Sequence, residues 1–165
     1  MSTSTEFFGT KKAILSLFHL REDTMAYSFF KYSYLFLMGG LSYYNIEILW
    51  RGYSHISMII CGGVCFLSIG GLNQYFDSGL GLLQQMLISA IIITTAEFVT
   101  GLIVNRWLKL NVWDYSQMPF NILGQVCLPY TIAWFFLSLI AIFLDDILRH
   151  YIFQEPWPLY FFLTR

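Results

Sequence analysis

Four long apolar stretches dominate the 165-residue chain. They lie at residues 32–49, 56–72, 80–103 and 119–144. A helix that spans the bilayer core needs about 20 mostly apolar residues, within a range of roughly 17–25. In each stretch the apolar residues surround the helix instead of forming one stripe, as burial in lipid requires. The sequence therefore predicts four membrane-spanning helices, with the lipid bilayer as the first partner of the chain.

The charge content excludes several other classes of protein. Charged residues make up 12% of the chain, against roughly 25% in a soluble domain, so they are too few to cover a soluble surface. The formal net charge is −1, which leaves no basic excess to bind nucleic acid. The three cysteines are too few, and odd in number, for a disulfide scaffold. These figures leave an integral membrane protein.

The connections between the apolar stretches are short. They comprise residues 50–55, 73–79 and, longer, 104–118. Short connections make consecutive helices antiparallel neighbours, so we expect an all-α, integral membrane four-helix bundle. The predicted organisation is an N-terminal segment at 1–26, a transmembrane domain at 27–148 and a C-terminal tail at 149–165.

Both terminal segments have features of membrane interfaces. Ile14, Leu17 and Phe18 follow helical spacing among basic residues, which predicts an amphipathic helix lying on the membrane surface. The tail contains Trp157 and Tyr160, residue types that anchor chains at the interface. We therefore expect the two segments to flank the bundle at the membrane surface.

The second apolar stretch contains two pairs of glycines, Gly62 with Gly63 and Gly70 with Gly71. Glycines that recur on a helix face let another backbone approach closely, so this helix is predicted to pack centrally. The alternative interpretation is that membrane helices simply contain more glycine than soluble ones.

The distribution of Lys and Arg predicts the orientation. With four spans, one side carries the two termini and loop 73–79, with six basic residues, and the other side carries three. Because the basic side faces the cytoplasm, both termini are expected there. The six are Lys11, Lys12, Arg21, Lys31, Arg149 and Arg165, and the three are Arg51, Arg106 and Lys109.

Two carboxylates, Glu47 and Glu97, are the only charged residues inside the four predicted spans. A charge at the centre of a membrane helix costs about 2.5–3.5 kcal/mol on insertion scales, so each requires a reason to be there. By residue count, Glu47 lies about 3 Å and Glu97 about 9 Å from the same membrane face. The fourth span begins at that face, and it places Asn121 and Gln125 at matching depths.

These positions predict a polar vestibule that opens to one membrane face. The loops on that side add further polar and aromatic residues. The candidate residues are Glu47, Arg51, His55, Glu97, Arg106, Trp113, Asp114, Tyr115, Asn121 and Gln125.

Three roles are open for this vestibule. A carboxylate in a low-dielectric site can carry protons or hold a cation. Arg51 and Arg106 could instead bind the phosphate of a lipid or of an anionic substrate. In the third interpretation the charges only neutralise each other, as Glu47 with Arg51 at helical i,i+4 spacing or Glu97 with Arg106.

Other signals of chemistry are weak. Cys61 and Cys65 share a helix face without a His or acid beside them, so no metal site and no cofactor are predicted. The chain has no GxxxxGK[ST], GxSxG or HExxH motif, so we expect no ATPase of its own and assign no catalytic residues. Ser116 with Pro119 is interpreted as the start of the fourth helix, and Pro129 as a kink inside it.

Two ordered blocks of residues resemble the signature of a family of bacterial membrane proteins. One block includes Trp113-Asp114-Tyr115-Ser116, and an earlier one includes Trp50-Arg51-Gly52. Together they cover roughly residues 29–150, and the family is catalogued as Putative ABC-transporter type IV. Gln74 is a departure, because the family pattern has an acidic residue there. The blocks also contain Glu47, His55, Ser57, Met58, Gly62, Gly63 and Asn73, and Glu97, Gly101, Asn105, Trp107, Pro119, Asn121, Gly124 and Cys127.

The resemblance implies a multi-pass protein of the bacterial inner membrane, but no substrate or catalytic residue. The leading hypothesis is a transport-associated, permease-like subunit that forms a homo-oligomer or pairs with a membrane partner and a separate ATPase. The first alternative is an enzyme acting on lipid headgroups or lipid-linked intermediates, with His55 and Asp114 in acid–base roles. The second is a non-catalytic assembly protein, in which Asp114 or Ser116 caps the fourth helix.

Overall fold

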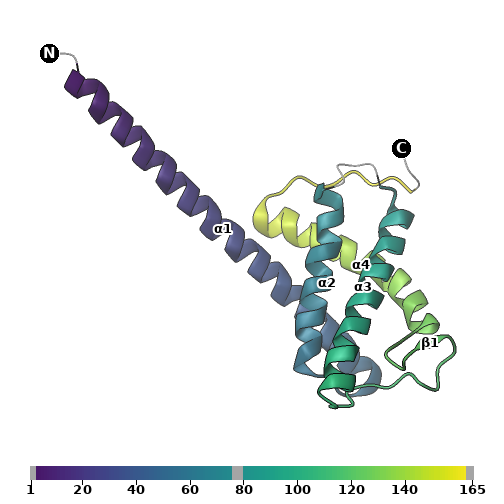
Figure 1. The fold of residues 1–165 in the computed structure, drawn as a ribbon. Helices are drawn as coiled ribbons and strands as arrows, with labels where there is room; N and C mark the ends of the chain where they lie inside the picture. The colour runs from purple at the N-terminus through teal and green to yellow at the C-terminus, as the bar shows by residue number, and fades with distance from the viewer. Residues whose placement is uncertain (1–2, 76–79, 163–165) are drawn as a thin grey trace. The chain divides into compact units, whose positions relative to one another are not determined.

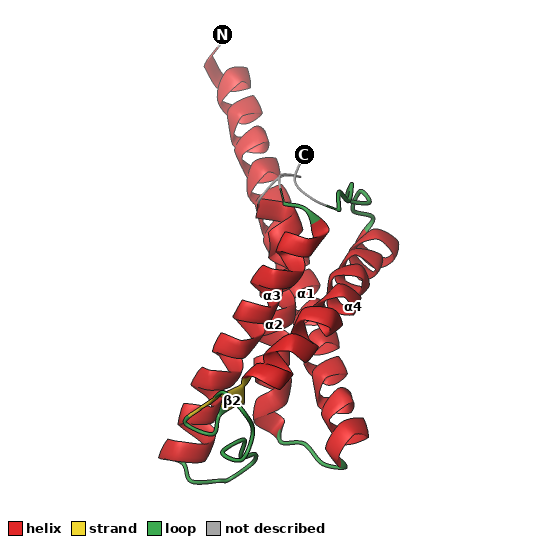
Figure 2. Cartoon of the chain, turned by 90° about the vertical axis from the view of Figure 1, so that its right-hand side faces the viewer, coloured by secondary structure: helices red, strands yellow, loops and turns green. Residues whose placement is uncertain are grey.

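The computed structural model describes the backbone of residues 3–75 and 80–162 and the side chains of residues 24–74 and 80–162. Within these ranges the chain is mostly helical, with one small antiparallel hairpin (Figures 1 and 2). The predicted all-α class is therefore confirmed. The elements are α1 (Thr3–Arg51), α2 (Ile56–Tyr75), α3 (Leu82–Gly101), the π-helix η1 (Leu102–Trp107), β1 (Asn121–Ile122), β2 (Val126–Cys127) and α4 (Leu128–Phe153).

The chain divides into two compact units, Met1–Tyr34 and Leu35–Arg165. The described part of the first unit is helical throughout, and α1 continues from it into the second unit without a break. The side chains of Ile14, Leu17 and Phe18 lie outside those described. The amphipathic character of the N-terminal helix and the limits of the three segments therefore stay predictions.

Three helices of the described chain are long and apolar enough to cross a membrane, judged by length and composition. They are Ile56–Gln74, Leu82–Trp107 and Leu128–Phe153. Residues 32–49 form helix as predicted, but they contain several Tyr residues as well as Asn45 and Glu47. A membrane crossing by this part of α1 stays a prediction.

Local signals explain where α1 ends and α2 begins. Gly52 has φ = 80°, a left-handed conformation that glycine adopts at low cost, and its N–H donates to the carbonyl of Ile48 at 2.8 Å. This is the usual way for a helix to end. Nδ1 of His55 then accepts the backbone N–H of Ser57 at 3.2 Å, which caps the first turn of α2.

The third helix is longer than predicted because it continues as η1. The carbonyls of Ile103 and Val104 accept the N–H groups of Leu108 and Leu110, at 2.8 and 3.0 Å. These bonds satisfy the end of the helix and turn the chain into the loop that leads to the hairpin. Short π-helical segments are frequently found at functional sites.

The predicted start of the fourth helix is wrong. Residues that sequence analysis placed in its first turns form the β1–β2 hairpin, with Asn121 opposite Cys127 and Ile122 opposite Val126. The helix begins only at Leu128, and Pro129 occupies its first turn, where it causes no kink because the N–H it lacks has no helical partner there. The depth assigned to Asn121 in the fourth helix is therefore also wrong, because this residue belongs to β1.

The other end of α4 also differs from the prediction. The helix runs nine residues beyond the predicted end at 144 and terminates at Gln154, which adopts a left-handed conformation with φ = 58°. Asp145, Asp146 and Arg149 therefore belong to a buried helical face and not to an interfacial tail. Glu47 and Glu97 are therefore not the only charged residues inside the long helices.

Glycines in the second unit lie at close helix approaches. A Cβ atom on Gly62 would overlap Tyr43 of α1, and one on Gly39 would overlap Phe66 of α2. Higher on α2, a Cβ on Gly70 would overlap the carboxylate of Asp145 in α4. Small residues therefore allow α2 to pack closely against both neighbours.

This packing leads to a stability prediction. The variant Gly62→Leu must displace Tyr43, and overpacking of this kind costs about 1–3 kcal/mol. We expect its temperature of aggregation in detergent, followed by size-exclusion chromatography after heating, to fall clearly below that of the wild type. Val64→Leu, at an exposed position of the same helix, adds apolar volume without a clash and should not lower it. Equal midpoints for Gly62→Leu and the wild type would contradict the packing.

Candidate functional site

A cavity of about 410 Å³ lies among the C-terminal end of α1, the end of α3, the start of α4 and the loop before the hairpin. We call it the Glu97 cavity. Helix α1 contributes charged and aromatic side chains, α3 contributes a single carboxylate, and α4 and the loop contribute aromatic side chains. Its polar and aromatic wall consists of Tyr43, Glu47, Trp50, Arg51, Glu97, Tyr115, Tyr130 and Trp134.

Glu97 is held inside the bundle by uncharged donors. Glu97 is only 4% exposed to solvent. One carboxylate oxygen accepts the hydroxyl of Tyr43, and the other accepts Nε1–H of Trp134 at 2.8 Å. The rings of Tyr43 and Trp134 stack with centroids 5.1 Å apart, which fixes both donors. The alternative interpretation, in which Glu97 pairs with Arg106, does not hold, because Arg106 lies on the exposed side of η1.

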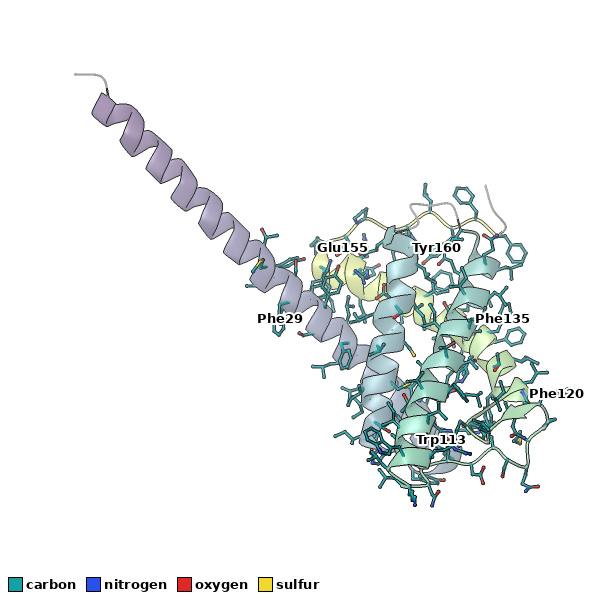
Figure 3. The ribbon with its side chains drawn as sticks, in the orientation of Figure 1. Phe29, Trp113, Phe120, Phe135, Glu155 and Tyr160 are labelled. Atoms are coloured by element: carbon teal, nitrogen blue, oxygen red, sulfur yellow. The ribbon has the colours of Figure 1, made fainter. Side chains whose placement is uncertain are left out.

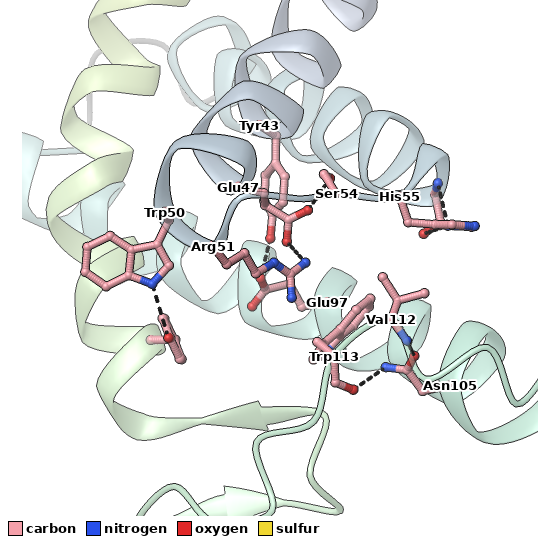
Figure 4. A network of polar contacts seen from close by, with 12 residues as sticks. Tyr43, Glu47, Trp50, Arg51, Ser54, His55, Glu97, Asn105, Val112 and Trp113 are labelled. Carbon is pink, nitrogen blue, oxygen red and sulfur yellow. Dashed lines mark hydrogen bonds and ion pairs between the residues drawn. The ribbon is translucent and has the colours of Figure 1, made fainter.

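Glu47 differs from Glu97 in having a charged partner. Its carboxylate accepts hydrogen bonds from Arg51 and from the hydroxyl of Ser54 (Figure 4). The interpretation of Glu47 and Arg51 as a neutralising i,i+4 pair is therefore confirmed. Arg51 also lies over the ring of Tyr53, and its buried Nε–H has no partner in the structure. One donor of the guanidinium thus remains for a ligand.

Two tyrosines form the rim of the Glu97 cavity. The rings of Tyr115 and Tyr130 stack with centroids 4.7 Å apart, and Trp50 donates its Nε1–H to the Tyr130 hydroxyl at 3.3 Å. Burial, together with the charge of Glu97, raises the pKa of Tyr115 above its ordinary value. Its phenol therefore stays protonated at neutral pH and can donate a hydrogen bond into the cavity.

Asn105 organises the loop beside the cavity. Its Nδ2 donates to the Trp113 carbonyl at 3.0 Å and to Oε1 of Gln125 at 2.9 Å, while its Oδ1 accepts the N–H of Val112 at 2.7 Å. Trp113 in turn donates Nε1–H to the Gln125 carbonyl at 2.8 Å. These hydrogen bonds attach the loop and the hairpin to η1. A Cβ on Gly101 would overlap Gln125, so the hairpin packs directly on α3, one turn beyond Glu97.

Four of the predicted vestibule residues neither line the cavity nor belong to the hydrogen-bonded support around Asn105. His55 caps α2 through Ser57, and Arg106 is exposed. Asp114 accepts the N–H of Ser116 at 2.8 Å and its hydroxyl at 3.0 Å, so it stabilises a turn in the loop instead of capping the fourth helix. Asn121 donates to the carbonyls of Ser116 and Met118 within the same loop.

The structure therefore separates the ten predicted residues into three groups. Four of them line the cavity, namely Glu47, Arg51, Glu97 and Tyr115. Trp113 and Gln125 belong to the hydrogen-bonded support around Asn105. The remaining four, His55, Arg106, Asp114 and Asn121, lie outside it.

Sequence reasoning missed the aromatic partners of Glu97. Tyr43 and Trp134 occupy long apolar stretches, where aromatic residues are ordinary. A signal was nevertheless present, because a buried carboxylate requires donors, and Tyr and Trp are among the residues in these spans whose polar hydrogens can serve. Asn105 was missed as a site residue because it was assigned to a loop.

The described residues contain no group of three or more His, Cys, Asp or Glu side chains that could hold a metal ion. Cys61 and Cys65 are buried in α2 and are not paired in a disulfide. The chemistry available in the cavity is therefore that of a carboxylate, an ion pair and several neutral donors.

Comparison with known proteins agrees with the resemblance seen in the sequence. The family described as Putative ABC-transporter type IV matches residues 28–164, which contain the Glu97 cavity, the hairpin and all three apolar helices. No solved structure matches the chain. The chain therefore belongs to the Putative ABC-transporter type IV family, and with its three apolar helices it is a transport-associated membrane protein.

Proposed function

We propose that this protein is a permease-like subunit of a transporter in the bacterial inner membrane. In this proposal the Glu97 cavity receives the transported solute at one membrane face. The chain carries no nucleotide-binding GxxxxGK[ST] motif, so the energy comes from a separate ATPase. A second copy or another membrane subunit completes the pathway, because a bundle of three or four helices encloses little space by itself.

The state of Glu97 is the observation that supports this function most directly. A buried carboxylate that only served the fold would be expected to have a cationic partner, as Glu47 has in Arg51. Glu97 instead receives hydrogen bonds from Tyr43 and Trp134 and forms one wall of a cavity. Ionisable groups in this situation inside membrane helices commonly mark pathways for ions, protons or substrates.

The two alternative functions receive different support. The enzyme hypothesis needs His55 and Asp114 to converge, but each is engaged in its own turn, with Ser57 and Ser116 respectively. No observation favours that hypothesis. The assembly hypothesis is supported by the bonds between Asn105, Trp113 and the hairpin, which give the Trp113 motif a structural role. That role is compatible with transport, because the same bonds support the wall of the cavity.

The variant Glu97→Gln tests the proposed function. It keeps the size of the side chain and a hydrogen-bonding group for Tyr43 and Trp134, so stability should change by about 1 kcal/mol or less. It removes the charge. The wild type or the variant is expressed in cells that lack the gene, and small molecules inside and outside the cells are measured by untargeted mass spectrometry. We expect the wild type to change these pools and the variant to leave them as they are in the deletion strain.

Asp114→Asn provides the matched control, because it neutralises an acid outside the cavity while keeping an acceptor for Ser116. This control should restore the wild-type pools. Membrane levels of all variants must be equal by immunoblot. Restoration by Glu97→Gln, or pools that do not depend on the gene at all, would contradict the transport function.

The proposal also includes an orientation with both termini in the cytoplasm. Tyr53, between α1 and α2, and Leu159, in the C-terminal segment, are exposed at opposite ends of the apolar helices. The native cysteines are buried, so an added one should dominate labelling. We expect a membrane-impermeant maleimide to label Tyr53→Cys on intact cells and Leu159→Cys only after permeabilisation. The reverse pattern would invert the topology.

A further inference from the structure

A second cavity, of about 540 Å³, lies at the opposite end of the apolar helices. It is bounded by the last turn of α2, the first turn of α3, the end of α4 and the segment that follows α4. We call it the Asp146 cavity. Its polar wall consists of Asn73, Gln74, Gln85, Asp146, Arg149 and Glu155.

The segment after α4 is fixed over this cavity by hydrogen bonds. The N–H of Leu82 at the start of α3 donates to the Phe161 carbonyl at 2.7 Å, and the N–H of Glu155 donates to the Arg149 carbonyl at 3.1 Å. Gln74 of α2 donates to the Glu155 carboxylate at 2.8 Å. Figure 3 shows Glu155 and Tyr160 on this segment, which crosses the ends of α2 and α3. The cavity therefore has a defined wall on that side.

The charges around the cavity are unequal. Asp145, Asp146 and Arg149 are 0%, 4% and 3% exposed, and Glu155 is half-buried beside them. Arg149 donates Nε–H to Asp145 at 2.5 Å and lies 3.4 Å from Glu155. Among the side chains that the structure describes, one guanidinium therefore lies beside three carboxylates. A buried charge without a counterion is costly, so the cavity is suited to a cation and not to an anion.

Asp146 is the carboxylate left with uncharged partners. Its Oδ2 accepts the Tyr160 hydroxyl and Nδ2–H of Asn73, the latter at 3.0 Å. Burial and the adjacent carboxylate raise the pKa of Tyr160, so the phenol remains a donor. Both bonds go to the same oxygen, and the Asp146 side chain also forms part of the cavity wall. The arrangement resembles that of Glu97, but at the other end of the helices.

An unpartnered buried amide gives an independent indication of a ligand. Gln85 is 4% exposed and lines the cavity. Its Nε2 donates to the Leu80 carbonyl at 3.2 Å, but its buried Oε1 has no hydrogen-bond partner. A buried acceptor without a hydrogen-bond partner lowers the stability of the fold, because it has lost its hydration and gained nothing in return. A ligand that carries N–H donors would satisfy it, together with the acceptors on Asn73 and Gln74.

The residues that line the Asp146 cavity also favour an organic cation over a bare metal ion. A bare metal ion needs several oxygen ligands within about 2.0–2.6 Å, and the side chains that the structure describes contain no group of three acidic, His or Cys ligands. The cavity is larger than such an ion requires, and Trp157 adds an aromatic face on which an organic cation can lie. We propose that the Asp146 cavity binds the ammonium group of an organic amine.

The donor group could belong to a free polyamine or to an ethanolamine lipid headgroup, since both present a primary ammonium. The assignment does not depend on the transport function of the Glu97 cavity, because it concerns different residues at the opposite end of α3 and α4. The two ideas can therefore fail separately.

Titration of the full-length protein with spermidine, in phosphatidylcholine nanodiscs at fixed ionic strength, tests the free amine. By isothermal titration calorimetry we expect saturable binding to the wild type, weakened at least tenfold in Asp146→Asn. Gln85→Met should also weaken binding, although it leaves every carboxylate of the cavity intact. Asp114→Asn removes an equal charge outside both cavities and should bind spermidine as the wild type does.

Native mass spectrometry of detergent-purified protein tests the lipid source. Retention of phosphatidylethanolamine over phosphatidylcholine, lost in Asp146→Asn, would assign the headgroup as the ligand, and spermidine binding would assign the free amine. Either result supports the site. It is overturned if neither amine binds the wild type, if Asp146→Asn and Gln85→Met bind as tightly as the wild type, or if Mg²⁺ alone displaces spermidine at equal ionic strength. Equal elution profiles after heating establish that the variants are folded.

Discussion

The arrangement of polar residues in this protein depends on one constraint, which is that an ionised side chain inside an apolar bundle must find a partner. Two carboxylates meet this requirement with a guanidinium four residues along the same helix, Glu47 with Arg51 and Asp145 with Arg149. Two others, Glu97 and Asp146, receive hydrogen bonds only from uncharged side chains. Both members of the second group line cavities, and Glu47 lines one as well. What distinguishes Glu97 and Asp146 is therefore that no cationic side chain among the described residues neutralises the carboxylate that faces the cavity.

Close helix packing makes these partnerships possible. The carboxylate of Asp145 lies where a side chain on Gly70 would be, so only glycine at that position of α2 leaves room for the pair with Arg149. Gly62 similarly lets Tyr43 approach α2, from which position its hydroxyl reaches Glu97 on α3. The glycines of α2 therefore affect the electrostatics of both ends of the bundle, although none of them carries a functional group.

Much of the fold and part of the candidate site could be predicted from the sequence. The grouping of Glu47 with Glu97 depended on the order of the helices and on where the first and third helices end. The order is reproduced and both helices end within four residues of the predicted positions, so both residues line one cavity. Asn121 was misplaced because an apolar run with Phe120, Ile122 and Leu123 looks like helix. Those side chains are in fact exposed on a hairpin. Pro129, a residue favoured in the first turn of a helix, was the available signal for the true start.

The second polar cluster was missed for a physical reason that also explains its position. Asp145 and Asp146 follow directly after the fourth predicted stretch, which ended at residue 144, and so they were placed outside it. The helix continues because Arg149 pairs with one of them and Tyr160 and Asn73 bind the other. The result is a polar cavity at each end of α3 and α4, with buried apolar residues such as Ile93 and Ile142 between them. In the proposed function, a solute that passes from one cavity to the other has to cross these apolar residues, and the ABC-transporter family suggests a membrane or ATPase partner as the source of the movement that this requires.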